Sequence, residues 1–332
     1  MKKKIFLTGA EGFIGSHLLE LLVKKNYKVK ALCLYNSFNH WGWLDEVDPK
    51  ILNEVEIISG DIRDKDFVYK NTKDIDIIVN LAALIAIPYS YEAVESFINT
   101  NIIGLNNILS ASLKNNCKVI HTSTSEVYGE PDRFPISEKD SVFAKSPYSA
   151  TKIAGDQLCF SYYRSFGLPV TLIRPFNTFG PRQSLRAIIP TIITQAITNN
   201  GIIKLGNIYP KRNFNYVKDI INGFEKSIKL KKFNGELINL GGSFEISIKD
   251  LVKLISKIMN KDIIIKTDKK RYRPKLGEVN RLVSSKIKSK KILNWIPKYD
   301  KKAMFEEALS ETIDWYFKNI SLYKSKSKIY TK

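Results

Sequence analysis

Three polar side chains near the middle of the chain could together act on an alcohol. Tyr148 and Lys152 are four residues apart in YSATK (148–152), so on a helix they share one face. A lysine ammonium beside a phenol favours the phenolate and lowers the pKa of the tyrosine towards working pH. Thr124, in STSEVYG (123–129), can hydrogen-bond the same reacting oxygen. A lone pair of this spacing is more often an exposed helix pair, so its interpretation depends on the rest of the chain.

A glycine-rich segment near the start supports the catalytic interpretation. TGAEGFIG (8–15) places Gly9, Gly12 and Gly15 between a predicted strand and a predicted helix. Glycines let the backbone turn tightly and approach a pyrophosphate, whose charge then faces the helix N-terminus. Because this segment follows the first strand of an alternating pattern, it predicts a dinucleotide site.

The residue that would read the adenosine ribose is not evident. About 20 residues after the glycines one expects an acid for the 2′-hydroxyl, or an arginine for a 2′-phosphate. The second predicted strand ends instead in Tyr35 and Asn36, and Arg63 is the nearest other cation. Without a clear phosphate clamp we expect NAD, and NADP stays open.

Strands and helices alternate through the first half of the chain. The predicted strands are 4–8, 27–35, 55–59, 76–83, 118–124 and 169–175, and the predicted helices are 13–25, 93–115 and 148–166. This alternation predicts an α/β fold, a Rossmann-type doubly wound parallel sheet. We expect residues 1–175 to form the NAD(P)-binding domain, with segments near 210–240 returning to it. A smaller C-terminal α/β lobe (176–209 and 241–320) would bind substrate, and 321–332 would be a basic tail.

The charge of the chain is strongly uneven. It has 53 Lys and Arg against 33 Asp and Glu, and residues 201–332 hold 31 of the basic and 13 of the acidic side chains. Such an asymmetry raises the hypothesis of a nucleic-acid-binding protein on a Rossmann core. No basic stretch is interleaved with aromatic residues, however, and most of these cations are Lys, whereas specific phosphate recognition favours Arg. We therefore expect a solvated surface and no nucleic-acid partner.

Composition also bears on the compartment. With 44% hydrophobic and 26% charged residues the chain is globular, and it is not disordered throughout. Cys33, Cys117 and Cys159 match no disulfide or metal spacing, so we expect buried, reduced thiols and no metal. The start, MKKKIFL, imitates a basic leader, but polar residues interrupt any apolar region, and no apolar run reaches membrane-spanning length. We expect a cytoplasmic protein.

Together these motifs resemble those of the extended short-chain dehydrogenase/reductases, specifically the nucleotide-sugar 4,6-dehydratases. The resemblance runs from TGAEGFIG through TSEVYG and YSATK to RPFNTFGPR (174–182), RNFNYVKD (212–219) and RPKLGEV (273–279). It is greatest with the GDP-mannose 4,6-dehydratases and with the N-acetylhexosamine dehydratases of legionaminic acid biosynthesis. NSFNHWGWLD (36–45), ALIAIPYSY (83–91) and RQSLRAIIPTIITQ (182–195) resemble the latter group.

The resemblance assigns a chemical role to Glu126. A 4,6-dehydratase oxidises carbon 4 of the sugar, removes the acidified proton on carbon 5 and expels the carbon 6 hydroxyl. Glu126, two residues after Thr124, matches the base of that step, and Ser125 stands where dTDP-glucose dehydratases have an acidic aspartate. Glu126 would then serve as both base and acid.

The resemblance also implies binding residues. The nucleotide-sugar substrate would be bound by Ser90, Asn177, Arg186, Arg212 and Arg273. The cofactor would be bound, in addition to Tyr148, Lys152 and the three glycines, by Phe13, Ile14, Tyr35, Asn36, Asp61, Ile62, Leu81, Ala82, Ala83 and Asn101. Family members commonly dimerise through helices like 93–115 and 148–166, so a homodimer is expected.

Other reactions stay open. A UDP-glucuronate decarboxylase also begins with carbon 4 oxidation, and a 4-epimerase returns the hydride to carbon 4. The substrate of a decarboxylase carries a carboxylate that needs an added cation, and nothing near YSATK supplies one clearly. Both GDP- and UDP-N-acetylglucosamine are possible dehydratase substrates.

Overall fold

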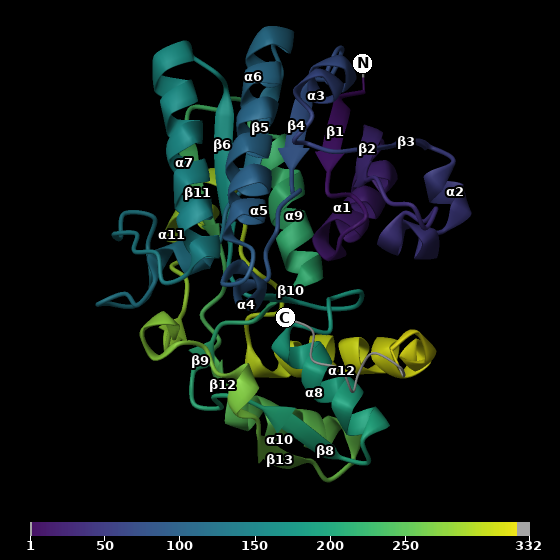
Figure 1. Ribbon diagram of the computed structural model, residues 1–332, viewed down its shortest axis with the longest axis vertical. Coiled ribbons are helices and arrows are strands. Elements are labelled where there is room, and N and C mark those ends of the chain that lie inside the picture. Colours follow the sequence, from purple (N-terminus) through teal and green to yellow (C-terminus); the bar gives the residue numbers. More distant parts are fainter. Residues whose placement is uncertain (1, 324–332) are drawn as a thin grey trace.

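A parallel sheet of seven strands forms the centre of the protein in the computed structural model, which describes residues 2–323 (Figure 1). The strand order is β11-β6-β5-β4-β1-β2-β3, and each neighbouring pair is parallel. The strands are β1 (Lys4–Thr8), β2 (Lys28–Leu34), β3 (Val55–Gly60), β4 (Ile77–Asn80), β5 (Lys118–Thr122), β6 (Val170–Pro175) and β11 (Glu236–Leu240). The predicted α/β Rossmann-type fold is confirmed.

Helices cover both faces of this sheet. On one face lie α3 (Lys65–Asn71), α6 (Leu105–Asn115) and α7 (Pro147–Phe166), and on the other α1 (Phe13–Lys24), α9 (Val217–Ile228) and α11 (Ile287–Leu293). Alternate residues of β1 serve the two layers, because Ile5 and Leu7 join one cluster of buried apolar side chains and Phe6 joins the other. Short helices α2 (Pro49–Leu52), α4 (Ile87–Ser90) and α5 (Val94–Ile98) lie in the connections.

A smaller lobe lies beyond the carboxyl ends of the strands, at the bottom of Figure 1. Its helices are α8 (Ile188–Thr198), α10 (Ile248–Met259) and α12 (Lys302–Lys318). Short strands pair as β7 (Thr178–Phe179) with β10 (Asn215–Tyr216), β8 (Ile202–Leu205) with β13 (Ile264–Thr267), and β9 (Lys211–Arg212) with β12 (Ile246–Ser247) and β14 (Arg281–Leu282). Part of its apolar interior is continuous with the core on the α1 side of the sheet.

The predicted helix 93–115 is not uniform. Between α5 and α6 lies a π-helical segment, η2 (Asn99–Gly104). π-Helical turns widen the backbone and often occur near functional sites. Here the segment carries the buried Asn101, whose amide binds both main-chain polar groups of Leu84 (2.9 Å each) and the Thr151 hydroxyl (3.0 Å). Through Asn101, the π-helical segment thus connects the loop after β4 to α7.

Residues 324–332, most of the predicted basic tail, lie outside the described residues, and Ile320–Leu322 forms the short helix η6. The three cysteines are buried and unpaired, as predicted. Within residues 2–323 no helix is both long and apolar enough to cross a bilayer. In the same range no cluster of His, Cys, Asp and Glu side chains could hold a metal ion.

Candidate active site

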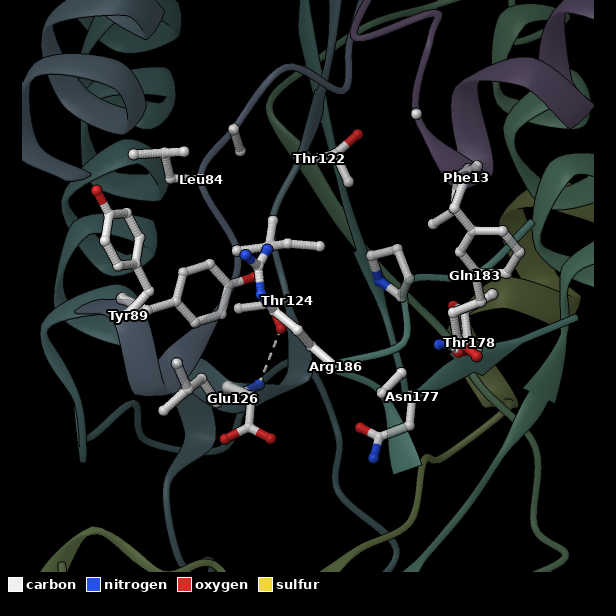
Figure 2. Close-up of a pocket in the computed structure, with 18 of the residues that line it drawn as sticks. Phe13, Leu84, Tyr89, Thr122, Thr124, Glu126, Asn177, Thr178, Gln183 and Arg186 are labelled. Atoms are coloured by element: carbon white, nitrogen blue, oxygen red, sulfur yellow. Dashed lines mark hydrogen bonds between the residues drawn. The ribbon is translucent and has the colours of Figure 1, made fainter. Parts of the chain in front are cut away.

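A cavity of about 820 Å³ lies between the carboxyl ends of the strands and the smaller lobe. Its walls come from the glycine-rich loop, the loops after β3, β4, β5 and β6, the residues before α8 and the segment around Arg273. The sheet reverses its strand order between β1 and β4, which is where parallel α/β sheets bind ligands. Figure 2 shows side chains from these loops converging on the cavity.

The glycine-rich loop is packed so closely that larger residues would not fit. Gly9 has a φ of +66°, which favours glycine, and a Cβ on Gly15 would lie 2.1 Å from the Gly9 carbonyl oxygen. Gly12 stands at the N-terminus of α1 and lines the cavity. The loop therefore brings its backbone close to the cavity at the N-terminus of α1, the position at which a helix of this kind binds a dinucleotide pyrophosphate.

Tyr148 is fixed at the start of α7. Ser146 caps this helix by a reciprocal pair of hydrogen bonds with Ser149, and Pro147 occupies its first turn, so the helix begins just before the tyrosine. Tyr148 is buried yet lines the cavity. Burial raises the pKa of Tyr148, while a hydrogen bond with Thr124 lowers it and the charge of Glu126 raises it.

Lys152 does not contact the phenol as the spacing suggested. Its Nζ donates to the main-chain oxygen of Thr122 at 2.5 Å, and the side chain is not part of the cavity wall. Burial lowers the pKa of Lys152 to about 8, with Asp156 opposing the shift. The hydroxyl of Thr124, rather than this ammonium, is the neighbour that favours the phenolate. Lys152 is thus held at the carboxyl end of β5, one helical turn along α7 from Tyr148.

Glu126 reaches the cavity from the short helix η3 (Ser125–Tyr128), which follows β5. Thr124 caps η3 by accepting a hydrogen bond from the Glu126 N–H at 3.2 Å, drawn as the dashed line in Figure 2. The Glu126 carboxylate lies 3.5 Å from the Arg273 guanidinium. Thr124, Glu126 and Tyr148, three of the proposed catalytic residues, therefore line one part of the cavity.

Cations line the neighbouring wall. Arg212 is buried, donates to the carbonyls of Lys211 (2.9 Å) and Val279 (2.6 Å), and lies 3.8 Å from Glu278. Its pKa is lowered by burial, although the charge of Glu126 counteracts this effect. Arg273 and Arg186 also line the cavity, as does Asn177. These residues give the cavity the charge expected of a site for a nucleoside diphosphate.

Comparison with known proteins agrees with this geometry. Residues 6–308 match the family model described as GDP-mannose 4,6 dehydratase. The chain belongs to this family. A curated member of similar sequence is the UDP-N-acetyl-alpha-D-glucosaminuronate decarboxylase of Bacillus cytotoxicus, 31% identical over 95% of this chain and 98% of the relative. The family thus includes dehydratases and decarboxylases that act on nucleotide sugars.

Two solved structures of relatives contain NAD. The dTDP-glucose 4,6-dehydratase of Streptomyces venezuelae superposes with a TM-score of 0.85 at 26% identity, over 97% of this chain and 99% of that one. The UDP-glucuronic acid 4-epimerase of Bacillus cereus, in complex with UDP-glucuronic acid and NAD, also gives 0.85, at 28% identity over 95% and 99%. The protein is an enzyme of the extended short-chain dehydrogenase/reductase superfamily that uses NAD and binds a nucleotide sugar.

Most of the predicted cofactor residues of this family member line the cavity. They are Gly9, Gly12, Phe13, Ile14, Gly15, Asp61, Ile62, Leu81, Ala82, Ala83 and Tyr148. A Cβ on Gly9 would meet the backbone of Ala82 and one on Gly15 the backbone of Gly9, so only glycine allows this close packing of the loop beside the cavity. Asp61 is tied to Arg63 by paired contacts of 2.5 to 3.0 Å, and Arg63 lines the same end of the cavity.

Besides Lys152, four predicted residues lie away from the cavity wall. Tyr35 is 70% exposed, and the Asn36 amide donates to the carbonyl of His40 at 2.8 Å. Ser90 is buried in α4, where its hydroxyl donates to the Ile87 carbonyl at 2.7 Å. Asn101 serves the loop-to-helix contacts described above. The structure thus places these four as supports or surface residues, not as contacts within the described cavity.

Glu11, Gln183 and Glu278 line the cavity but were not predicted. Glu11 could have been found, because it is the acid directly before Gly12 in the glycine-rich loop. Gln183 and Glu278 carried no comparable signal, since each reaches the cavity through the folding of the smaller lobe.

Proposed function

We propose that the enzyme is a nucleotide-sugar 4,6-dehydratase that converts GDP- or UDP-N-acetylglucosamine to the 4-keto-6-deoxy sugar. The observation that carries this proposal is the carboxylate of Glu126 in the same part of the cavity as Tyr148 and Thr124. An epimerase needs an alcohol base but no carboxylate at this point. A dehydratase needs a second base for the proton on carbon 5.

The proton transfers follow from this arrangement. Tyr148 takes the proton of the sugar 4-hydroxyl, and the Thr124 hydroxyl holds the same oxygen. Bound NAD supplies the acceptor for the carbon 4 hydride and, once reduced, its donor to carbon 6. Glu126 takes the proton from carbon 5 and delivers a proton to the departing carbon 6 hydroxyl, so one water leaves. Hydride return to carbon 6 leaves an enolate, which takes a proton at carbon 5 from Glu126 once Glu126 has regained a proton from solvent. Tyr148 releases its proton to solvent, so the overall change is the loss of one water.

Arg212 and Arg273 would hold the diphosphate, assisted by Asn177. The Arg212 guanidinium is already oriented before substrate binds, because it donates hydrogen bonds to two main-chain carbonyls. Arg273 is paired with Glu126 at 3.5 Å, so substrate phosphate that attracts Arg273 would loosen its hold on the base. Substrate binding and readiness of Glu126 would then be coupled through this ion pair.

The sequence motifs 36–45, 83–91 and 182–195 support an N-acetylhexosamine substrate and a place in legionaminic acid biosynthesis. We also propose a homodimer that pairs α5 to α7 of two copies. Val94, Ile98, Ile103 and Phe166 are exposed apolar side chains on these elements, which fits that arrangement. Light scattering at increasing concentration tests it, and a concentration-independent monomer would contradict it.

A decarboxylase is the second candidate, and Arg186 favours it. This exposed arginine precedes α8 and projects into the cavity, and Figure 2 shows it on the side of Thr124 and Glu126. Within residues 2–323 its guanidinium has no ion-pair partner. A cation in that position could bind a sugar carboxylate, as the substrate of the Bacillus cytotoxicus relative would require.

One experiment separates these reactions. Purified enzyme is incubated with UDP-N-acetylglucosamine, GDP-N-acetylglucosamine, GDP-mannose, UDP-glucuronate and UDP-N-acetylglucosaminuronate, and product masses are measured. Loss of water from an N-acetylglucosamine nucleotide supports the dehydratase, and loss of carbon dioxide from a uronate overturns it. A product of unchanged mass but altered retention indicates an epimerase. Tyr148→Phe serves as the inactive control for every substrate.

A further inference from the structure

Glu11 occupies the place where an acid was expected but absent from the sequence of β2. Its Oε1 accepts a hydrogen bond from the Leu34 N–H at 3.0 Å, at the carboxyl end of that strand. The residues that follow in the chain, Tyr35 and Asn36, do not line the cavity, whereas Glu11 does. The glycine-rich loop therefore delivers a carboxylate to the end of β2 from a different part of the chain.

The Glu11 carboxylate is held in place but incompletely satisfied. The Trp43 N–H donates to the Glu11 carbonyl at 3.0 Å, and Gly42 packs against the Glu11 side chain. Its second oxygen, Oε2, is buried and has no hydrogen-bond partner in the described chain. A buried carboxylate oxygen without a donor is unfavourable, and the last torsion of a glutamate is soft enough to turn this oxygen into the cavity. A hydroxyl of a bound ligand could therefore donate the hydrogen bond that Glu11 Oε2 lacks.

The charges around Glu11 are an unbalanced carboxylate and an arginine that is already paired. Asp45 lies close enough to act, with Glu11, on the Cys33 thiol, whose pKa is raised to about 12 chiefly by burial. Arg63, the cation that lines this end of the cavity, is engaged by Asp61. The 2′-phosphate of NADP, placed beside Glu11, would be repelled by the carboxylate, because Arg63 is already paired with Asp61.

We propose that Glu11 is the cofactor-specificity residue of this enzyme. Its carboxylate accepts hydrogen bonds from the 2′- and 3′-hydroxyls of the adenosine ribose of NAD, and it repels the 2′-phosphate of NADP. The assignment does not depend on the sugar reaction, because NAD is present in the structures of both a dehydratase and an epimerase relative. Failure of the dehydratase proposal would therefore leave it untouched.

The test measures binding of NADH and NADPH to nucleotide-free enzyme by fluorescence titration. The wild type should bind NADH more tightly, and Glu11→Gln should reduce the ratio of the two affinities by about ten- to a hundredfold, the range for a hydrogen bond to a charged group. Glutamine keeps an acceptor for the Leu34 N–H, so the loop should hold its shape. Glu46→Gln, an exposed carboxylate in the adjoining segment 42–46, is the matched control and should leave the ratio unchanged.

A second measurement needs no variant. The wild type is titrated with the NADH analogue that lacks the adenosine 2′-hydroxyl, which should bind about tenfold or more weakly than NADH. An unchanged affinity ratio in Glu11→Gln overturns the proposal. So does equal binding of the deoxy analogue, which also decides the matter if Glu11→Gln fails to fold.

Discussion

The Glu126 carboxylate lies 3.5 Å from the Arg273 guanidinium, and this ion pair joins the segment after β5 to the far wall of the cavity. The Glu126 side chain is 13% exposed and the Arg273 side chain 26%, so both can meet a ligand. Glu126, the proposed base, and Arg273, which is proposed to bind the substrate phosphate, thus form an ion pair before substrate binds. Substitutions at either residue should therefore affect chemistry and binding differently.

Glu126→Gln should stop water loss without stopping oxidation at carbon 4. Loss of a general acid or base lowers a rate by about 10²–10⁴-fold. Formation of the 4-keto-6-deoxy product should fall by that factor, while exchange of a label at carbon 4 continues. Mass spectrometry of the product and of recovered substrate measures the dehydration rate and the label exchange. Glu54→Gln, which changes an exposed carboxylate just before β3, is the control. A normal rate in Glu126→Gln would remove this residue from the chemistry.

Arg273→Ala should mainly weaken substrate binding. It leaves Arg212 and its two carbonyl contacts in place, so the fold around the cavity should survive. Removing one charge-assisted phosphate contact should raise KM by about tenfold or more, with a smaller change in kcat. Steady-state kinetics with the accepted nucleotide sugar measure the split. A fall confined to kcat would indicate that Arg273 acts on Glu126 and not on the diphosphate.

Asp156→Asn should strongly destabilise the protein. The Asp156 carboxylate accepts from the Arg174 guanidinium at 2.7 Å and from the Ser123 hydroxyl at 2.9 Å, and both members of the ion pair are almost fully buried. Removing one partner leaves a buried charge and should lower the free energy of unfolding by about 3–5 kcal/mol.

Urea unfolding measures this loss. Glu311→Gln is the matched control, because it breaks the Lys218–Glu311 pair at 2.7 Å, whose side chains are about half exposed. That change should be below about 1 kcal/mol. Equal effects of the two substitutions would mean that the Asp156–Arg174 pair contributes no more than a surface pair.

Gly15→Ala should prevent dinucleotide binding. The added Cβ would lie 2.1 Å from the Gly9 carbonyl oxygen, so the loop must move out of the groove. NADH titration should show a large loss of affinity. Gly167→Ala, at the end of α7, has a φ of +70° and open space around it, so it should lower stability by about 1–2 kcal/mol without changing NADH affinity. An unchanged NADH affinity in Gly15→Ala would contradict the assignment of the glycine-rich loop as the dinucleotide site.

His17 should make the protein less stable in mild acid. Burial, followed by the charge of Arg182, lowers the pKa of His17 to about 4. The unfolded chain binds a proton at this residue near pH 6.5, so it holds more protons than the folded state between about pH 6.5 and 4. Stability therefore falls as pH decreases through this window, by about 2 kcal/mol from this residue between pH 7 and pH 5.

His17→Gln should shrink the difference in unfolding free energy between pH 7 and pH 5 by that amount. Glutamine can still donate to the Pro181 carbonyl, which lies 3.1 Å from the histidine ring. His40→Gln, at an exposed position, should leave the difference unchanged. Identical pH profiles for the His17 variant and wild type would contradict the effect of burial.

Local patterns predicted the strands and the glycine-rich loop well, because buried parallel strands and close backbone turns depend on nearby residues. They could not predict the π-helical segment 99–104, whose Asn101 contacts Leu84 and Thr151 in distant segments of the chain. Lys152 was placed on the phenol by helix spacing alone. Its position also depends on the Thr122 carbonyl, which belongs to a strand 30 residues away in sequence.

Contacts between distant segments explain the remaining differences. In the aromatic segment 38–43, Trp43 packs edge-on against Trp315 of α12, with ring centres 5.5 Å apart. Glu11 reaches β2 because Gly42 and Trp43 of the following loop hold it there. The sequence gives the amino-acid types at these positions, but local patterns do not predict the fold that brings these residues together.

The last strand to join the large sheet, β11, is made only after α8 and the first short strands of the smaller lobe have been synthesised. Until residue 240 leaves the ribosome, β6 has one unpaired edge, although all six of its residues are buried in the finished protein. An exposed apolar edge invites pairing with other chains. A gene fragment that stops at residue 175 would consequently yield an aggregating sheet, not a portable NAD module, and the growing chain must keep that edge protected during translation.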